Sequence, residues 1–355
     1  MIRAPDDAAE GPRSEGGGGG GGPGAPGRRA TLSRRDLAVL AIAAAGCAGL
    51  ATRVSATSAL AFASTFVVAL LLVPPLARFA RARAWVVLPG GRAAHRRRTP
   101  LLGGLAVFLP FLAATLALGC LGDPKAFGLA AGACVMVGCG VLDDVRGVSP
   151  RVKIASELVA GACLVVAGFR LPALAAPGLG TVALGAFEIP LLLCWVVVAT
   201  NAVNLTDGMD GLAASLCLLG CAGSVLVGSH VVPAVVLGGA ALGFLRHNLP
   251  PASIFLGDAG SLVIGFALAA FALDAPAATN LPVAYGLLAY SIGDVGLAIL
   301  RRLLRGKPIF VGDRSHVHHK LREHLHARFA PLAVAVGFAA LQLGLALTWP
   351  GLVSL

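Results

Sequence analysis

The sequence has few charged residues and few aromatic residues. Only 13% of its 355 residues are Asp, Glu, Lys or Arg, and only 6% are Phe, Trp or Tyr. A soluble globular domain carries about 25% charged residues, so this shortage of charge excludes that class. The hydrophobic content of 57% and the mean hydropathy of +0.84 indicate a membrane protein instead.

Cysteine patterns typical of metal sites are also lacking. All eight cysteines fall in apolar runs, and none forms a CxxC pair. Small apolar packing residues are the usual interpretation of such cysteines. The sequence therefore indicates neither a disulfide framework nor a thiolate metal site.

Apolar runs near the length of a bilayer recur almost from end to end of the chain. A spanning helix needs about 17 to 25 apolar residues. We therefore expect an all-α, polytopic membrane protein of about 10–11 transmembrane helices. The runs, of which the first is the weakest, cover residues 37–52, 58–80, 101–120, 126–142, 152–169, 186–203, 211–228, 230–246, 258–275, 280–300 and 330–348.

Basic residues divide unevenly between the two sides of these runs. One side receives 25 of the 28 Lys and Arg residues, and the other receives only Arg53, Lys125 and Arg170. Cytoplasmic loops carry the excess of Lys and Arg, so the basic side is predicted to face the cytoplasm. The net charge of +11 then reflects topology and attraction to the lipid bilayer. A nucleic-acid partner is not expected, because the basic loops are short and lack interleaved aromatic residues.

The first 36 residues differ in composition from the rest of the chain. Residues 1–36 are rich in Gly, Pro and Arg, with an unbroken glycine run from Gly16 to Gly22. Such a segment cannot bury enough apolar surface to fold, so a disordered cytoplasmic tail is predicted. The next run resembles a secretory signal, but an uncleaved span agrees better with the charge distribution. Residues 37–355 are then a single transmembrane domain.

Acidic residues recur where apolar runs meet the predicted cytoplasmic side. Asp143 and Asp144 end one run. Asp207 and Asp210 follow another, and Asp258 stands at the start of a third. A solvated loop start is the simpler interpretation of the first pair alone, but repetition favours function, since acids in membrane spans are costly. Several carboxylates at one boundary need a cation, and oxygen ligands favour magnesium over zinc.

The segment NAVNLTDGMDGLA places amides and carboxylates together. On a helix, Asn204, Asp207 and Asp210 follow one another at intervals of three residues and lie near one side. Gly208 and Gly211 allow the backbone to turn sharply or a ligand to approach it.

Histidines gather in the segment RSHVHHKL, which carries His316, His318 and His319 in a loop rich in Arg and Lys. They can ligate a metal, donate hydrogen bonds to phosphates, or belong to a basic loop that only fixes topology. The surrounding cations favour the phosphate interpretation.

Three further polar residues and one glycine-containing segment can each be interpreted in a structural or a functional way. Lys153, ten residues past Asp143, either returns towards the aspartates or is an interfacial lysine. Glu157 and Asp294 fall within apolar runs, as packed structural acids or as functional ones. The glycines of FLGDAGS suit a backbone anion nest beside a helix start, although two glycines are a weak signal.

Together these segments resemble the polyprenyl-phosphate N-acetylhexosamine-1-phosphate transferase family. The resemblance runs from about Arg78 to Lys320, with four motifs in the family order. RTPLLGG resembles the family's proline–diglycine segment. NLTDGMDGLA is close to the phospho-N-acetylmuramoyl-pentapeptide translocase form, whereas DRSHVHHKL resembles the N-acetylglucosamine-type enzymes. That loop lies where the family binds the sugar, so the N-acetylglucosamine type is favoured.

The resemblance implies a reaction and a set of site residues. A UDP-N-acetylhexosamine would give its sugar 1-phosphate to undecaprenyl phosphate and release UMP, as the first membrane step of cell-envelope glycan synthesis such as O-antigen synthesis. Mg²⁺, or Mn²⁺ in its place, would be held by Asp258, Asp207 and Asp144. The remaining motif matches are catalytic Asp143, Asp144, Asp207, Lys153, His316, His318 and His319, and nucleotide-placing Asn201, Asn204 and Asp210.

The same resemblance places the protein in the bacterial cytoplasmic membrane, with catalytic loops on the cytoplasmic face. The resemblance makes Asp143 either a general base or a group that places the nucleophile. A homodimer is a further expectation.

Three rival functions remain at this point. Phospho-N-acetylmuramoyl-pentapeptide transfer is the alternative within the family. A secondary transporter also carries acids in its spans, but its site lies near the bilayer midplane, whereas these acids end spans on one face. A CDP-alcohol phosphotransferase needs an arginine shortly after DG and two further spaced aspartates, which DGMDGLAASLCLLG lacks.

Overall fold

The computed structural model describes most of the membrane domain. The described residues are 33–88, 98–118, 122–171, 174–176, 180–182, 184–226, 228–273 and 288–304, with isolated positions 334 and 337. Residues 1–32 of the predicted tail, the histidine segment and most of the last predicted span lie outside these ranges.

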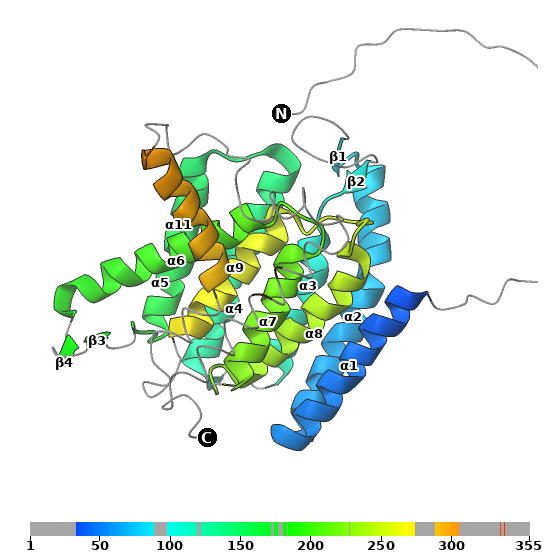
Figure 1. The fold of residues 1–355 in the computed structure, drawn as a ribbon, viewed down its shortest axis with the longest axis horizontal. Coiled ribbons are helices and arrows are strands. Elements are labelled where there is room, and N and C mark those ends of the chain that lie inside the picture. Colours follow the sequence, from blue (N-terminus) through cyan, green and yellow to red (C-terminus); the bar gives the residue numbers. More distant parts are fainter. Residues whose placement is uncertain are drawn as a thin grey trace, which may run out of the picture.

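The described residues form mainly helices (Figure 1). Each of the first nine predicted runs coincides with a helix, and α11 overlaps the tenth and extends four residues beyond it. The helices are α1 (Arg34–Arg53), α2 (Ala56–Ala82), α3 (Gly103–Ala117), α4 (Pro124–Arg146), α5 (Pro150–Val166), α6 (Glu188–Thr206), α7 (Leu212–Leu226), α8 (Val231–Asn248), α9 (Gly257–Leu273) and α11 (Ala289–Leu304). Short antiparallel hairpins pair β1 (Val86–Val87) with β2 (Thr99–Pro100) and β3 (Leu174–Ala176) with β4 (Gly180–Val182).

Length and composition identify the membrane helices. Within the described ranges, α2, α4, α8 and α6 with its preceding turn are long and apolar enough to cross a membrane. Shorter apolar helices accompany them in α1, α3, α7 and α9. The predicted class, an all-α polytopic membrane protein, is confirmed.

Side-chain caps decide where α4 and α5 begin. Asp123 and Ser149 accept backbone N–H bonds at the starts of these helices. Pro124 and Pro150 occupy the first turns, where a missing N–H is tolerated. Since only a short turn separates the end of α4 from the start of α5, Lys153 lies at the same end of the bundle as the last turns of α4.

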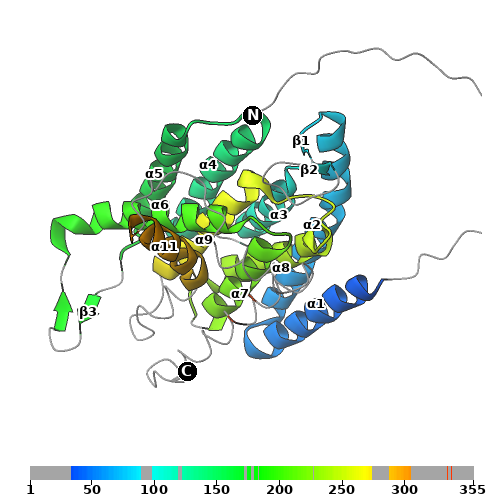
Figure 2. The same cartoon turned by 45° about the horizontal axis from the view of Figure 1, so that its top comes forward.

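Helix α9 is the centre of the bundle (Figures 1 and 2). Every residue from Ala259 to Leu273 is buried, and α9 packs against α3, α4, α6 and α7. A helix that is apolar around its whole circumference is expected to be buried in this way. Its first turn carries Asp258, so the most enclosed helix presents an acid at one end.

Glycines allow α3 and α4 to approach α9 closely. A Cβ atom on Gly104 would lie 2.1 Å from the backbone nitrogen of Gly260, and one on Gly140 would lie 2.5 Å from the Cα of Ala259. Small residues of this kind let membrane helices bring their backbones together. Both contacts lie beside Asp258 and hold the start of α9 in place.

Helix α1 lies at the edge of the bundle against α2 and α8 (Figure 1). Asp36 in its first turn pairs with Arg246 in the last turn of α8. The start of α1 and the end of α8 therefore share one side, as the distribution of basic residues predicts.

Leucine at Gly140 should destabilise the bundle, because its side chain would have to displace the α9 backbone. Overpacking of this kind costs about 1–3 kcal/mol. The matched control is Gly138→Leu on the same helix, where an added Cβ meets nothing within 4 Å. We expect a lower melting temperature in detergent for Gly140→Leu alone. Equal melting temperatures for the two variants would contradict the close approach of α4 to α9.

Candidate active site

Four helices bring their polar ends together around Asp258. The Lys153 Nζ atom donates to Asp143 Oδ2 at 3.2 Å and forms a short hydrogen bond with Asp258 Oδ2. From α6, the Asn204 Nδ2 atom donates to Asp258 Oδ1 at 3.0 Å and to the Ser261 hydroxyl at 2.8 Å. Of the two interpretations of Lys153, the structure agrees with its return towards the aspartates.

Asp143 is held through both of its carboxylate oxygens. Its Oδ1 atom accepts the Val148 N–H at 2.7 Å, and its Oδ2 atom accepts from Lys153. Gly147, with φ of +72°, lets the chain turn sharply between α4 and α5. The Asp143 carboxylate is thus fixed at the mouth of this turn.

Asp144 caps the start of α9 from the end of α4. Its Oδ1 atom accepts the Asp258 N–H at 2.9 Å, and its Oδ2 atom accepts the Ala259 N–H at 3.2 Å. A carboxylate here satisfies free N–H groups and matches the helix dipole. Gly257 has φ of +70°, and a Cβ there would lie 2.4 Å from Asp144 Oδ2. The predicted anion nest of FLGDAGS therefore binds the protein's own carboxylate.

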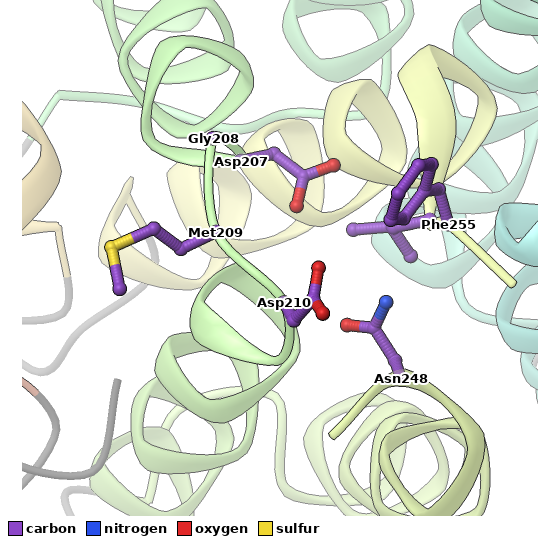
Figure 3. A pocket seen from close by; sticks show the side chains of 7 residues that line it. Asp207, Gly208, Met209, Asp210, Asn248 and Phe255 are labelled. Atoms are coloured by element: carbon purple, nitrogen blue, oxygen red, sulfur yellow. The ribbon is translucent and has the colours of Figure 1, made fainter. Parts of the chain in front are cut away.

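Asp207 and Asp210 line a pocket between the end of α6 and the loop before α9. Figure 3 shows the Asp207, Asp210, Phe255 and Asn248 side chains facing a shared space, whereas Met209 points away. Its cavity volume of about 40 Å³ is far below the roughly 300–1,000 Å³ of sites that enclose a drug-sized ligand. The pocket therefore suits one part of a larger substrate. Its lining is Asp207, Gly208, Met209, Asp210, Asn248, Phe255 and Leu256.

Asn248 and Phe255 were not singled out by the sequence analysis. The Asn248 side chain accepts the Gly211 N–H at 2.9 Å and donates to the Ile254 carbonyl at 3.0 Å. The Phe255 carbonyl accepts the Gly103 N–H at 3.0 Å, which links the RTPLLGG segment to this loop. The only signal available in the sequence was that both residues share the segment RHNLPPASIFLGDAGS with Asp258.

Negative charge exceeds positive charge among the described residues of this site. The pKa of Asp207 lies well above its ordinary value, because the protein shields the carboxyl from water and because Asp258, Asp144 and Asp210 repel its charge. A cation with oxygen ligands would relieve this repulsion. In the described part of the chain, no three His, Cys, Asp or Glu side chains form a metal cluster. Few protein carboxylates, water and substrate phosphates are the ligands that Mg²⁺ prefers.

Asn201 is not brought to this pocket. Its Nδ2 atom donates to both carboxylate oxygens of Glu157 at 2.8 Å and to the Val197 carbonyl at 2.9 Å. Its amide is therefore engaged inside the bundle, so a contact with nucleotide stays a prediction. The other predicted residues, His316, His318 and His319, lie outside the described ranges.

Known proteins resemble this chain across the whole described site. The model of glycosyl transferase family 4 matches residues 126–275, which run from α4 to α9. A probable undecaprenyl-phosphate N-acetylglucosaminyl 1-phosphate transferase of Bacillus subtilis (strain 168) is 33% identical over 275 residues, which are 74% of this chain and 76% of the relative. The chain belongs to glycosyl transferase family 4.

Two further relatives of this family 4 protein carry different names. A decaprenyl-phosphate N-acetylglucosaminephosphotransferase of Mycobacterium tuberculosis is 37% identical over 68% of this chain and 70% of the relative. A phospho-N-acetylmuramoyl-pentapeptide-transferase of Synechococcus sp. (strain JA-2-3B'a(2-13)) is 33% identical over 79% of this chain and 87% of the relative. The predicted family of polyprenyl-phosphate transferases is confirmed, and the protein is a membrane-embedded transferase.

Alanine at Gly257 should reduce transferase activity by at least about tenfold, because its Cβ would displace Asp144 from the start of α9. Gly168→Ala is the matched control: Gly168 has φ of +88°, lies at the opposite end of α5, and has nothing within 4 Å of an added Cβ. Both variants carry the backbone strain of positive φ, about 1–2 kcal/mol. Activity and melting temperature are measured for both. Equal activity in the two variants would contradict the role of the Asp144 cap.

Proposed function

We propose that this family 4 transferase moves N-acetylglucosamine 1-phosphate from UDP-N-acetylglucosamine to undecaprenyl phosphate and releases UMP. The observation that carries the proposal is the meeting of Asp143, Lys153 and Asp258 at the end of the central helix. N-acetylglucosamine is supported by the names of the Bacillus and Mycobacterium relatives and by the segment DRSHVHHKL. The product would begin a cell-envelope glycan.

The main task of the protein in this reaction is to stabilise the negative charges of two phosphate-bearing substrates. An oxygen of the lipid phosphate attacks the phosphorus that carries the sugar. The bond from that phosphorus to the bridging oxygen breaks, and UMP leaves with the electron pair. Phosphoryl transfer of this kind depends on positioning and on electrostatic stabilisation. A site at the cytoplasmic membrane boundary meets both the lipid phosphate and a nucleotide from the cytosol.

We assign Asp258 and Asp207 to hold Mg²⁺. The fit rests on oxygen donors and on the neighbouring carboxylates of Asp258, Asp144 and Asp210, which repel the charge of Asp207. When bound, the ion would offset the charge of the diphosphate. Asp144 supports Asp258 from behind, since both of its oxygens accept backbone N–H bonds from α9. Mn²⁺ suits the same carboxylate ligands.

The remaining residues surround the diphosphate and the nucleotide. Lys153, which bonds to Asp258, would offset part of the negative charge of the diphosphate. Asp210 lines the pocket together with the Phe255 ring and the Asn248 amide. An aromatic ring can stack on a nucleobase, and an amide can form hydrogen bonds with it. We therefore assign this pocket to part of the nucleotide, with Asn204 holding Asp258 beside it. His316, His318 and His319 are proposed to bind phosphate.

Purified protein should release UMP from UDP-N-acetylglucosamine in the presence of undecaprenyl phosphate and Mg²⁺, and EDTA should stop this release. Asp258→Asn should lower the rate by about 100-fold or more. The matched control is Asp123→Asn, an acid at the other end of α4 that an asparagine replaces well as a helix cap.

The same assay with UDP-N-acetylmuramoyl-pentapeptide tests the alternative donor. UMP release from that donor alone would replace N-acetylglucosamine in the proposal. Release that persists in EDTA would contradict the metal assignment. If no UMP is released from either donor or from other UDP-sugars, the proposed reaction is contradicted.

Asp143→Asn distinguishes a general base from a positioning group. A phosphate monoester has a second pKa near 6, so much of the lipid phosphate is ionised without a base at neutral pH. Because Asp143 is held by Val148 and Lys153, we expect positioning. The variant should then lose rate by about the same factor, relative to wild type, at every pH from about 6.5 to 8.5, because positioning does not depend on the ionisation of the lipid phosphate. A loss that is large at low pH and shrinks as the lipid phosphate ionises would instead establish a general base.

A further inference from the structure

A carboxylate lies buried beneath the site and has no role in the reaction as described so far. Glu157 is on α5, and its side chain is 0% exposed. Both of its oxygens accept from the Asn201 Nδ2 atom at 2.8 Å, which joins α5 to α6. An ionisable group inside a membrane bundle is costly to bury and is retained for a reason.

Joining two helices does not by itself require a charge. A glutamine opposite Asn201 would also form an interhelical hydrogen bond, as polar side chains do in membrane bundles. It would do so without the cost of burying a carboxylate. The charge of Glu157 therefore needs a partner beyond the amide of Asn201.

The cation nearest to Glu157 along α5 is Lys153, one helical turn before it. Residues four apart on a helix are neighbours on one face, so the Lys153 ammonium, which bonds to Asp143 and Asp258, belongs to the same face of α5 as the Glu157 carboxylate. The two helices thus carry two polar layers. The upper layer is Lys153 and Asn204 around Asp258, and the lower layer is Glu157 with Asn201.

The lower layer differs from the upper one in its access to substrate. Asp258 is partly exposed and is assigned to hold a cation, so a bound cation competes with Lys153 for that carboxylate. Glu157 is fully enclosed, and nothing that enters the site can reach it. Its side chain therefore remains one helical turn from Lys153, whatever binds at Asp258.

We propose that Glu157 is a positioning residue for the transfer reaction: held by Asn201, its carboxylate fixes the Lys153 ammonium at the floor of the site. This inference rests on the proposed function. Asn201 then acts on the reaction through Glu157 rather than through contact with the nucleotide.

The first test is Glu157→Gln, which keeps the size of the side chain and a hydrogen bond to Asn201 but removes the charge. We expect kcat to fall about tenfold, while KM for the UDP-sugar stays within about twofold. The melting temperature should change little, because the link between α5 and α6 persists. The donor is whichever UDP-sugar the wild-type protein accepts.

Two further variants separate charge from packing. In the swap Glu157→Asn with Asn201→Glu, the pair is rebuilt but the carboxylate moves to α6, so kcat should stay low. In Gly161→Ala, a Cβ would lie 2.8 Å from Leu193 in the same α5–α6 interface. That variant should lose stability and keep a kcat near wild type, because its charges are unchanged.

The outcomes are distinguishable. Wild-type kcat in Glu157→Gln, or full activity in the swap, would overturn the proposal in favour of a simple helix link. A kcat loss in Gly161→Ala equal to that of Glu157→Gln would also overturn it. If wild-type protein itself releases no UMP from any UDP-sugar, the proposed function fails and this inference fails with it.

Discussion

The hydrogen bonds of Lys153 to Asp143 and Asp258 join three helices at one point, and the rest of the site is arranged around them. Asp143 ends α4, Lys153 begins α5, and Asp258 begins the central helix α9. Charges withdrawn from water have to be paired, so these helices cannot shift independently without exposing an unpaired ion. The Asp144 cap adds a further link, which joins α4 directly to α9.

An excess of carboxylates over ammonium groups is the second constraint on the described site. Such an arrangement is unfavourable in an empty protein and becomes favourable when a cation and basic groups accompany anionic substrates. The location explains why so much apolar sequence surrounds so few polar residues. In the proposed reaction a polyprenyl phosphate is held at the membrane surface by its chain, and the acids at the helix ends would meet it there.

Helix packing and chemistry use the same residues in this protein. Gly104 and Gly140 bring α3 and α4 against the first turn of α9, beside the carboxylate of Asp258. The pair formed by Glu157 and Asn201 links α5 to α6 one layer below. The closest packing contacts of α9 and the acid of the site therefore share the first turn of this helix.

Much of this architecture could be predicted before any coordinates were known. Run length reveals the helices because bilayer thickness sets it, and acids at run ends reveal where polar helix ends gather, since both depend on local composition. Packing alone settled the hydrogen-bond partners. Helical periodicity does not say which faces meet, so the Asp144 cap, the Glu157 partner of Asn201, and the places of Asn248 and Phe255 emerged only when distant helices came together.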